Sequence, residues 1–143
     1  MNIPTSHPQT LALEFASAWN RLERKLDSSL GAIRGISLAE YRLLRALADA
    51  PNSQASRVDL AHAVGLTPSG VTRALRPMEK LGVVSTVRSK RDARLAIAAL
   101  TPAGRELVND ASLVVDDTMT AALERSSKVQ ADLEIFIELL RDV

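Results

Sequence analysis

Apolar residues recur at helical spacing over the first quarter of the chain. From about residue 9 to residue 33 they lie three or four positions apart, which is the pattern of one helix face, at Leu11, Phe15, Ala18, Leu22, Leu26, Leu30 and Ile33. Gly35 interrupts this pattern. Ser37 and Glu40 then form a capping box, in which each side chain pairs with the backbone of the other, so a second helix is expected from about residue 37 to residue 48.

Two shorter helices follow, and each begins and ends on a recognisable signal. Ser56 is the expected cap of the first, which Gly65 ends. Thr67 caps the second, with Pro68 at the first helical position, where its missing N–H is harmless. This helix is expected to run to about residue 81, with Gly82 after it.

The pattern then changes to short β-type runs. "VVSTVR" and "RLAIAAL" flank a charged tip and predict a hairpin. A long helix is expected from about residue 102 to residue 124, and a last helix carries the apolar stripe Val129, Leu133, Phe136, Ile137 and Leu140. The expected fold is therefore mainly α with a small β-hairpin.

Residues 57–76 match the requirements of a helix-turn-helix. Ala61 is small enough to let two helices approach, and Gly65 allows the positive φ of a tight turn. The apolar residues expected in the shared core are Leu60, Val64, Leu66, Val71 and Ala74. The alternative is any pair of helices joined by a glycine turn.

The hairpin that follows favours a winged helix-turn-helix, in which the second helix enters the major groove of DNA and the hairpin, or wing, contacts the backbone and minor groove. The candidate contacts on the helix are Ser69, Thr72, Arg73 and Arg76. Those on the wing are Arg88, Lys90, Arg91 and Arg94.

Charge is distributed unevenly along the 143 residues, although the formal net charge is only +1. Residues 57–94 hold eight Lys and Arg against three acidic residues, whereas residues 95–143 hold four against nine. A basic middle segment indicates a polyanionic partner, and a solvated surface is the alternative.

Composition also narrows the function. The chain has no cysteine, which excludes disulfides and thiol-based sensing, and the isolated His7 and His62 make a weak metal site. No apolar run approaches the roughly 18 residues that span a bilayer. With neither a nucleophile motif nor a glycine-rich phosphate loop, we expect a cytoplasmic protein that is not an enzyme and needs no cofactor.

The stretch from Leu66 to Leu107, with its Leu-Thr-x-x-Gly helix opening and Asp-x-Arg wing signature, resembles the MarR family of transcriptional regulators. The resemblance implies a homodimeric regulator, expected to be a repressor, that binds pseudo-palindromic operators. Members of the family are often released from DNA by a small aromatic or phenolic effector, and a small effector is expected here. It divides the chain into an N-terminal dimerisation helix (1–35), a winged helix-turn-helix domain (36–100) and C-terminal dimerisation helices (101–143). The apolar stripes of the outer helices are either intramolecular core or this dimer seam.

The same resemblance assigns roles within the wing. Arg94 is expected to enter the minor groove, and Asp92 can accept a charge-assisted hydrogen bond from Arg94 that fixes its direction. Alternatively, Asp92 is a turn residue that bonds local backbone.

Pro77 departs from the family, which usually carries a charged residue there. A proline inside a helix removes the bond to the carbonyl of Arg73, so we expect a kink near residues 73–77 that puts the direction of Arg76 in question.

Two functional assignments each have an alternative, one for the effector crevice and one for the partner of the winged helix. Trp19, Tyr41 and Arg42 lie on helices that border the effector crevice in the family; they are either ligand contacts or ordinary core and surface residues. The whole unit is either a DNA reader or a winged helix that binds other proteins, for which apolar rather than charged exposed residues would be expected.

Overall fold

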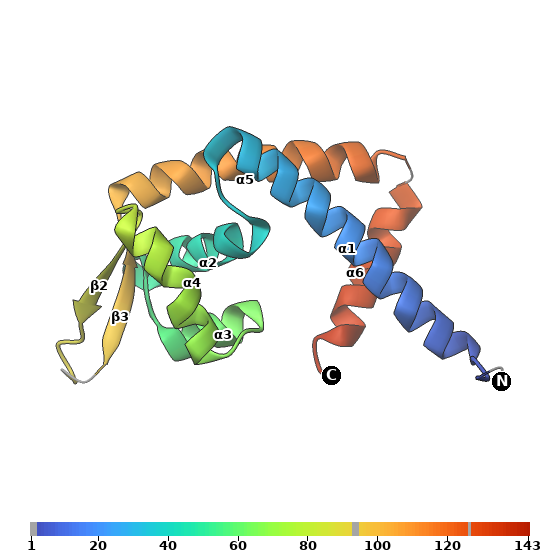
Figure 1. The fold of residues 1–143 in the computed structure, drawn as a ribbon, viewed down its shortest axis with the longest axis horizontal. Coiled ribbons are helices and arrows are strands. Elements are labelled where there is room, and N and C mark those ends of the chain that lie inside the picture. The colour runs from blue at the N-terminus through green and yellow to red at the C-terminus, as the bar shows by residue number, and fades with distance from the viewer. Residues whose placement is uncertain (1–2, 93–94, 126) are drawn as a thin grey trace.

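The computed structural model describes residues 3–92, 95–125 and 127–143 and is 72% helical. Its helices and strands follow the order expected from the sequence, with a short 3-10 turn and an additional strand before the third helix (Figure 1). The elements are α1 (His7–Arg34), α2 (Leu38–Asp49), η1 (Pro51–Ser53), β1 (Gln54–Ser56), α3 (Arg57–Val64), α4 (Pro68–Lys80), β2 (Val84–Arg88), β3 (Ala96–Leu100), α5 (Pro102–Leu123) and α6 (Ser127–Leu140).

The helix boundaries lie where the capping residues predict them. At the start of α2 the capping box is complete, because the Ser37 hydroxyl accepts from the Glu40 N–H and the Glu40 carboxylate accepts from the Ser37 N–H, both at 3.1 Å. Thr67 accepts from the N–H of Gly70 at 3.1 Å and so caps α4. Gly65 ends α3 with a φ of 72°, a conformation that suits glycine.

The wing is part of a three-stranded antiparallel sheet with the strand order β1-β3-β2. The predicted hairpin pairs Val84 with Leu100 at its base and Arg88 with Ala96 towards its tip. The third strand was not predicted from the sequence. It has only three residues, and its Ser56 pairs with Ile97 of β3, so that the start of α3 is attached to the wing.

The buried core joins the winged unit to the inner ends of α1 and α5. Leu26 and Leu30 of α1 and Val108 and Ala111 of α5 are buried in one cluster with the core side chains of α2, α3, α4 and the sheet. The expected helix-turn-helix core is confirmed at Leu60, Ala61, Val64 and Val71, and Ala74 packs against it. The assignment of Leu66 to this core was wrong: it is 43% exposed, because it lies beyond the turn at Gly65.

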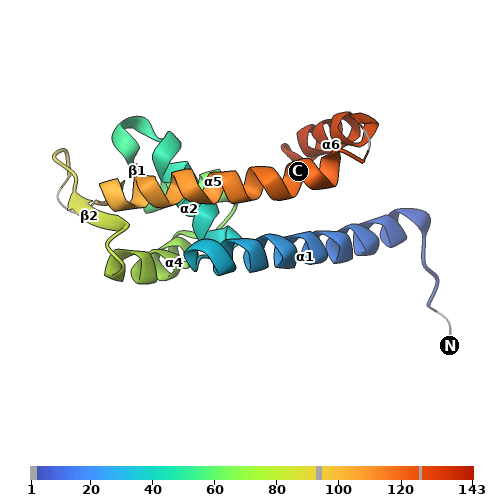
Figure 2. The same cartoon turned by 90° about the horizontal axis from the view of Figure 1, so that it is seen from above.

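The two long helices α1 and α5 lie side by side, as both views show (Figures 1 and 2). An ion pair between Arg34 and Asp110 joins them where α1 ends. Asp27 of α1 also accepts a hydrogen bond of 2.7 Å from the N–H of Leu38, the first residue of α2. The long helices are therefore connected to the winged unit through polar contacts as well as the core.

The outer parts of α1 and α6 expose a large apolar surface. Phe15 and Phe136 contact each other edge to face, with ring centroids 5.1 Å apart. Nevertheless, most large apolar side chains here remain exposed, including Leu11, Leu13, Phe15, Trp19, Val129, Ile135, Phe136, Ile137, Leu139 and Leu140. Within the described residues, no helix combines the length and apolar character needed to cross a bilayer.

A close backbone contact fixes the start of α5 against the base of the wing. The Thr101 hydroxyl donates to the carbonyl of Gly82 at 2.7 Å, and its N–H donates to the carbonyl of Val83 at 3.2 Å. Gly104, one turn into α5, lies so near that a Cβ there would be 2.1 Å from the Val83 carbonyl oxygen. Only glycine fits at this position without a backbone shift.

We therefore expect Gly104→Ala to lower the free energy of unfolding by about 1–3 kcal/mol, as overpacking does elsewhere. The matched control is Gly31→Ala in α1, where a Cβ would meet nothing within 4 Å. That change should stabilise the protein by about 0.5–1 kcal/mol through the helix preference of alanine. Urea unfolding of both variants tests this, and equal stabilities would contradict the close contact.

Candidate nucleic-acid interface

The helix α4 presents one polar face to solvent and one apolar face to the core. Val71, Leu75 and Met78 are fully buried. The predicted contact residues lie on the other side at spacings of three and four, with Ser69, Arg73 and Arg76 exposed and Thr72 partly buried. The Thr72 hydroxyl donates to the carbonyl of Pro68 at 3.1 Å, which holds that side chain against its own helix.

The helix α3 and its turn hold α4 in place. After Gly65 the chain closes the end of α3 with a bond of 2.9 Å from the Leu66 N–H to the Ala61 carbonyl. Arg42 of α2 donates to the carbonyl of Val64 at 2.9 Å, so a cation satisfies a backbone acceptor at the C-terminal end of α3. The turn before α4 is therefore fixed from the α2 side as well.

Pro77 does not end α4. The helix continues through it to Lys80, so Arg76 lies inside the helix and on the same exposed face as Arg73. The end of α4 is closed by Gly82, with a φ of 78°, and by a bond of 3.1 Å from the Val83 N–H to the Met78 carbonyl. The wing strand β2 therefore starts directly from the end of α4.

Within the described residues of the wing tip, Ser89 makes hydrogen bonds through both its backbone and its side chain. The Ser89 N–H donates to the carbonyl of Leu95 at 3.0 Å, and its hydroxyl accepts from the N–H groups of Arg91 and Asp92 at 3.2 and 3.4 Å. Arg88, Lys90 and Arg91 are exposed, and Asp92 is partly buried. Arg94, the predicted minor-groove residue, lies outside the described residues, and so does any contact it makes with Asp92.

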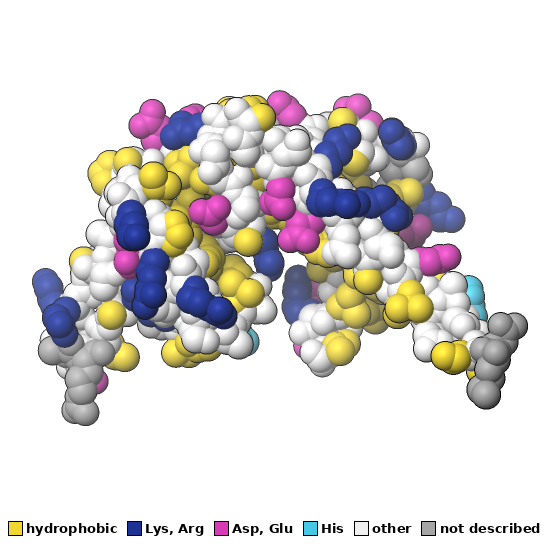
Figure 3. Space-filling model, viewed as in Figure 1, with side chains coloured by type: hydrophobic (Ala, Val, Ile, Leu, Met, Phe, Trp, Pro, Cys, Tyr) yellow, Lys and Arg dark blue, Asp and Glu magenta, His cyan; other side chains and the backbone are white. Residues whose placement is uncertain are grey.

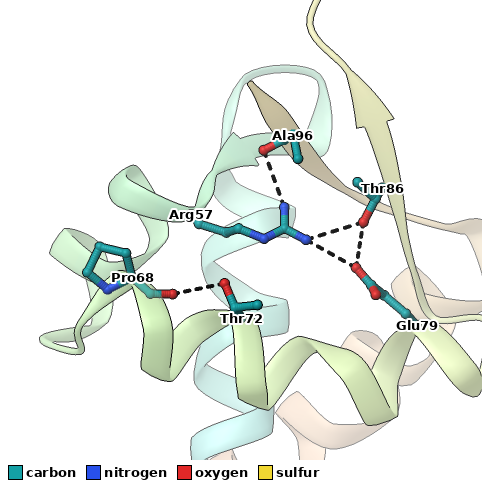
Figure 4. A network of polar contacts seen from close by, with 6 residues as sticks. All are labelled: Arg57, Pro68, Thr72, Glu79, Thr86 and Ala96. Carbon is teal, nitrogen blue, oxygen red and sulfur yellow. Dashed lines mark hydrogen bonds and ion pairs between the residues drawn. The ribbon is translucent and has the colours of Figure 1, made fainter. Parts of the chain in front are cut away.

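Arg57 joins α3, α4 and both strands of the wing, as Figure 4 shows. Its guanidinium donates to Glu79 of α4, to the Thr86 hydroxyl of β2 and to the carbonyl of Ala96 of β3, each at 3.3 Å. The Thr86 hydroxyl donates in turn to the Glu79 carboxylate at 2.5 Å. Sequence reasoning missed this network, although a cation in the first turn of a helix, where the dipole favours anions, was a signal that Arg57 had partners elsewhere.

Lys and Arg side chains gather over the winged unit in the space-filling view, and others lie along α1 (Figure 3). The described residues contain no group of three or more His, Cys, Asp or Glu side chains that could hold a metal ion. The winged unit therefore offers a cationic surface whose most regular feature is the exposed face of α4.

A second feature is a pocket of about 510 Å³ between α2 and α3. Two of the three candidate effector residues, Tyr41 and Arg42, line it, whereas Trp19 does not. Arg45 also lines the pocket and pairs with Asp49 at 3.1 Å, a hydrogen bond and charge contact that raise the pKa of Arg45. The remaining lining residues are Ala46, Ala50, Ala55, Asp59, Leu60, Ala63 and Val64.

Comparison with known proteins places this architecture among bacterial and archaeal regulators. The model of the MarR family matches residues 34–95. An uncharacterised HTH-type transcriptional regulator of Bacillus subtilis, YdgJ, is 36% identical over 77 residues, which are 54% of this chain and 46% of that protein. The match thus spans about half the length of this relative.

Two solved structures resemble nearly the whole chain. Sco3205 of Streptomyces coelicolor, a MarR family transcriptional regulator crystallised in complex with DNA, has a TM-score of 0.86 at 25% identity, covering 98% of this chain and 89% of its own. The transcriptional regulator BldR of Sulfolobus solfataricus has a TM-score of 0.83 at 25% identity, covering 94% of each chain. The likeness therefore includes the long outer helices as well as the winged unit.

Pro77 generates a prediction about the stability of α4. Because proline has no N–H to donate to the Arg73 carbonyl, Pro77→Ala should raise the free energy of unfolding by about 1–3 kcal/mol. Pro68→Ala, at the first helical position where no such bond exists, should change it by less than about 0.5 kcal/mol. Urea unfolding of both variants measures the difference, and equal effects would show that α4 already compensates for the proline.

Proposed function

We propose that the chain is a member of the MarR family of winged helix-turn-helix regulators and that it is a homodimeric repressor of pseudo-palindromic operators. The match to the family model over residues 34–95 and the winged-helix fold both support a transcriptional regulator. The operator, the dimer and the direction of regulation are our proposal. The observation that carries it is the exposed polar face of α4 beside a cationic wing.

The proposed contacts follow from where these side chains lie. On α4, Ser69, Thr72, Arg73 and Arg76 share a face, and a helix of this kind can present such residues to base edges in the major groove. On the wing, we assign Arg88, Lys90, Arg91 and Arg94 to the backbone and minor groove. We propose that Asp92 orients Arg94 by accepting a hydrogen bond from it.

The apolar surface on α1 and α6 supports the dimer. Single exposed apolar residues are ordinary, but a continuous group on two helices at opposite ends of the chain favours association. We therefore propose that 1–35 and 101–143 form the dimer and 36–100 reads DNA. Two-fold symmetry would place the two α4 helices about one DNA turn, roughly 34 Å, apart.

The first test is selection of bound duplexes from a random pool. We expect an inverted repeat with half-sites about ten base pairs apart, bound by a species that has the mass of a dimer in light scattering. The logarithm of the affinity should fall with the logarithm of the salt concentration by about 0.9 for each phosphate neutralised. If no sequence is enriched, the winged unit is better interpreted as a protein-binding module.

With the selected duplex, Arg73→Ala should weaken binding by about 1–3 kcal/mol and relax the sequence preference at one position of each half-site. Arg141→Ala is the matched control, because Arg141 is a similarly charged residue with a side chain 68% exposed, beyond α6 and away from the wing. Fluorescence anisotropy measures both. If the Arg73 variant binds with wild-type affinity and specificity, α4 is not the helix that recognises the DNA sequence.

We propose further that an aromatic carboxylate binds the pocket between α2 and α3 and releases the DNA. Its volume suits a small ligand, and Tyr41, Arg42 and apolar side chains line it. Since Arg42 also bonds the Val64 carbonyl, a carboxylate that recruits the guanidinium would loosen the turn before α4.

Benzoate is the simplest probe of this proposal. It should raise the melting temperature of the wild type and weaken operator binding, and Arg42→Met should abolish both effects. Arg24→Met, on the exposed side of α1, is the control and should respond as the wild type does. If the Arg42 variant still responds, any aromatic carboxylate site lies elsewhere.

A further inference from the structure

We propose that Arg57 is a positioning residue that fixes the angle between the recognition helix α4 and the wing, so that both engage the duplex as one preorganised unit. This inference rests on the proposed DNA binding and goes beyond it. It assigns a DNA-binding role to a side chain that is largely shielded from solvent, its side chain being 20% exposed.

The Arg57 guanidinium joins four elements of the winged unit. Its three acceptors belong to α4, β2 and β3, while Arg57 itself begins α3 (Figure 4). A planar guanidinium can donate in several fixed directions at once, whereas a lysine ammonium is a point charge on a flexible stem. The arrangement therefore depends on arginine and not merely on positive charge.

Arg57 contacts the wing in the middle of β2 and near the tip of the hairpin. Thr86 is the middle residue of β2, and Ala96 pairs with Arg88 at the tip end of the hairpin. At the base of the wing, farther from its tip, Val84 of β2 is buried in the same core cluster as Met78 of α4. The contacts of Arg57 thus add a second point of attachment nearer the tip, and two separated points restrain a hairpin against pivoting.

The contacts of Arg57 are poorly suited to stabilising the fold. The Arg57–Glu79 pair is partly exposed, and such pairs contribute little to folding. The cation also lies at the end of α3 where the helix dipole opposes it. A role in setting geometry accounts for this arrangement better than a role in overall stability does.

The consequence for binding is preorganisation. A wing that pivots freely must be immobilised when it enters the groove next to the one that α4 occupies, which lowers affinity. Glu79 distinguishes a positioning role from a purely electrostatic one, because it is a negatively charged residue on a surface proposed to bind DNA. Removing its charge would strengthen binding to a polyanion if only electrostatics mattered, and would weaken binding if Glu79 positions Arg57.

The test uses the full-length protein and its selected duplex at fixed salt. We expect Glu79→Gln and Arg57→Lys each to weaken binding about tenfold and to reduce hydroxyl-radical protection of the minor groove, while protection of the major-groove half-site persists. Combining them should be no worse than either alone, since both break the same network. Glu106→Gln, which removes one negative charge from an exposed position near the start of α5, is the charge-matched control and should not weaken binding.

Melting temperatures within a few degrees of the wild type would show that the variants remain folded. Glu79→Asp keeps the negative charge on a shorter side chain, so weakened binding by this variant as well would indicate a geometric requirement. Tighter binding by Glu79→Gln, or unchanged wing protection in Arg57→Lys, would overturn this inference alone. A wild-type protein that binds no selected duplex would overturn the proposed function and this inference with it.

Discussion

The contact between Gly104 and the Val83 carbonyl determines how the long helix α5 leaves the winged unit. It brings the backbone of a helix against the start of β2, which itself follows directly from the end of α4. Thr101 adds two hydrogen bonds to the same short segment. Because α5 also holds α1 through buried side chains and the Arg34–Asp110 pair, the position of the outer helices depends on this one joint.

Much of the fold could be predicted because its boundaries are encoded locally. The capping box at Ser37 and Glu40, the Thr67 cap and the turn at Gly65 each involve residues within five positions of one another, so a pattern in the sequence contains all the partners. The assignment of Leu66 to the core from the helix-turn-helix offsets was wrong because this residue lies in the turn between α3 and α4, where its side chain is exposed. The strand β1 escaped prediction because its three residues are ordered only by pairing with β3.

Only part of the candidate nucleic-acid interface could be predicted from local sequence patterns. The exposed face of α4 follows from its period, since the apolar positions Val71, Leu75 and Met78 define the opposite side. Arg57 could not be paired from the sequence, because its partners lie 22, 29 and 39 positions away. Both Arg57 and Pro77 violate a local preference of the helix that holds them, and such conflicts tend to concentrate at functional sites.

The rigid start of α5 makes that helix a lever. Its 22 residues extend about 33 Å from the wing joint, given a rise of 1.5 Å per residue. A rotation of about 5° at the joint would displace the far end by about 3 Å, close to the 3.4 Å rise of one base pair along B-DNA. A small rotation of α5 about its start would therefore move the outer helices relative to the winged unit by nearly the length of one base-pair step.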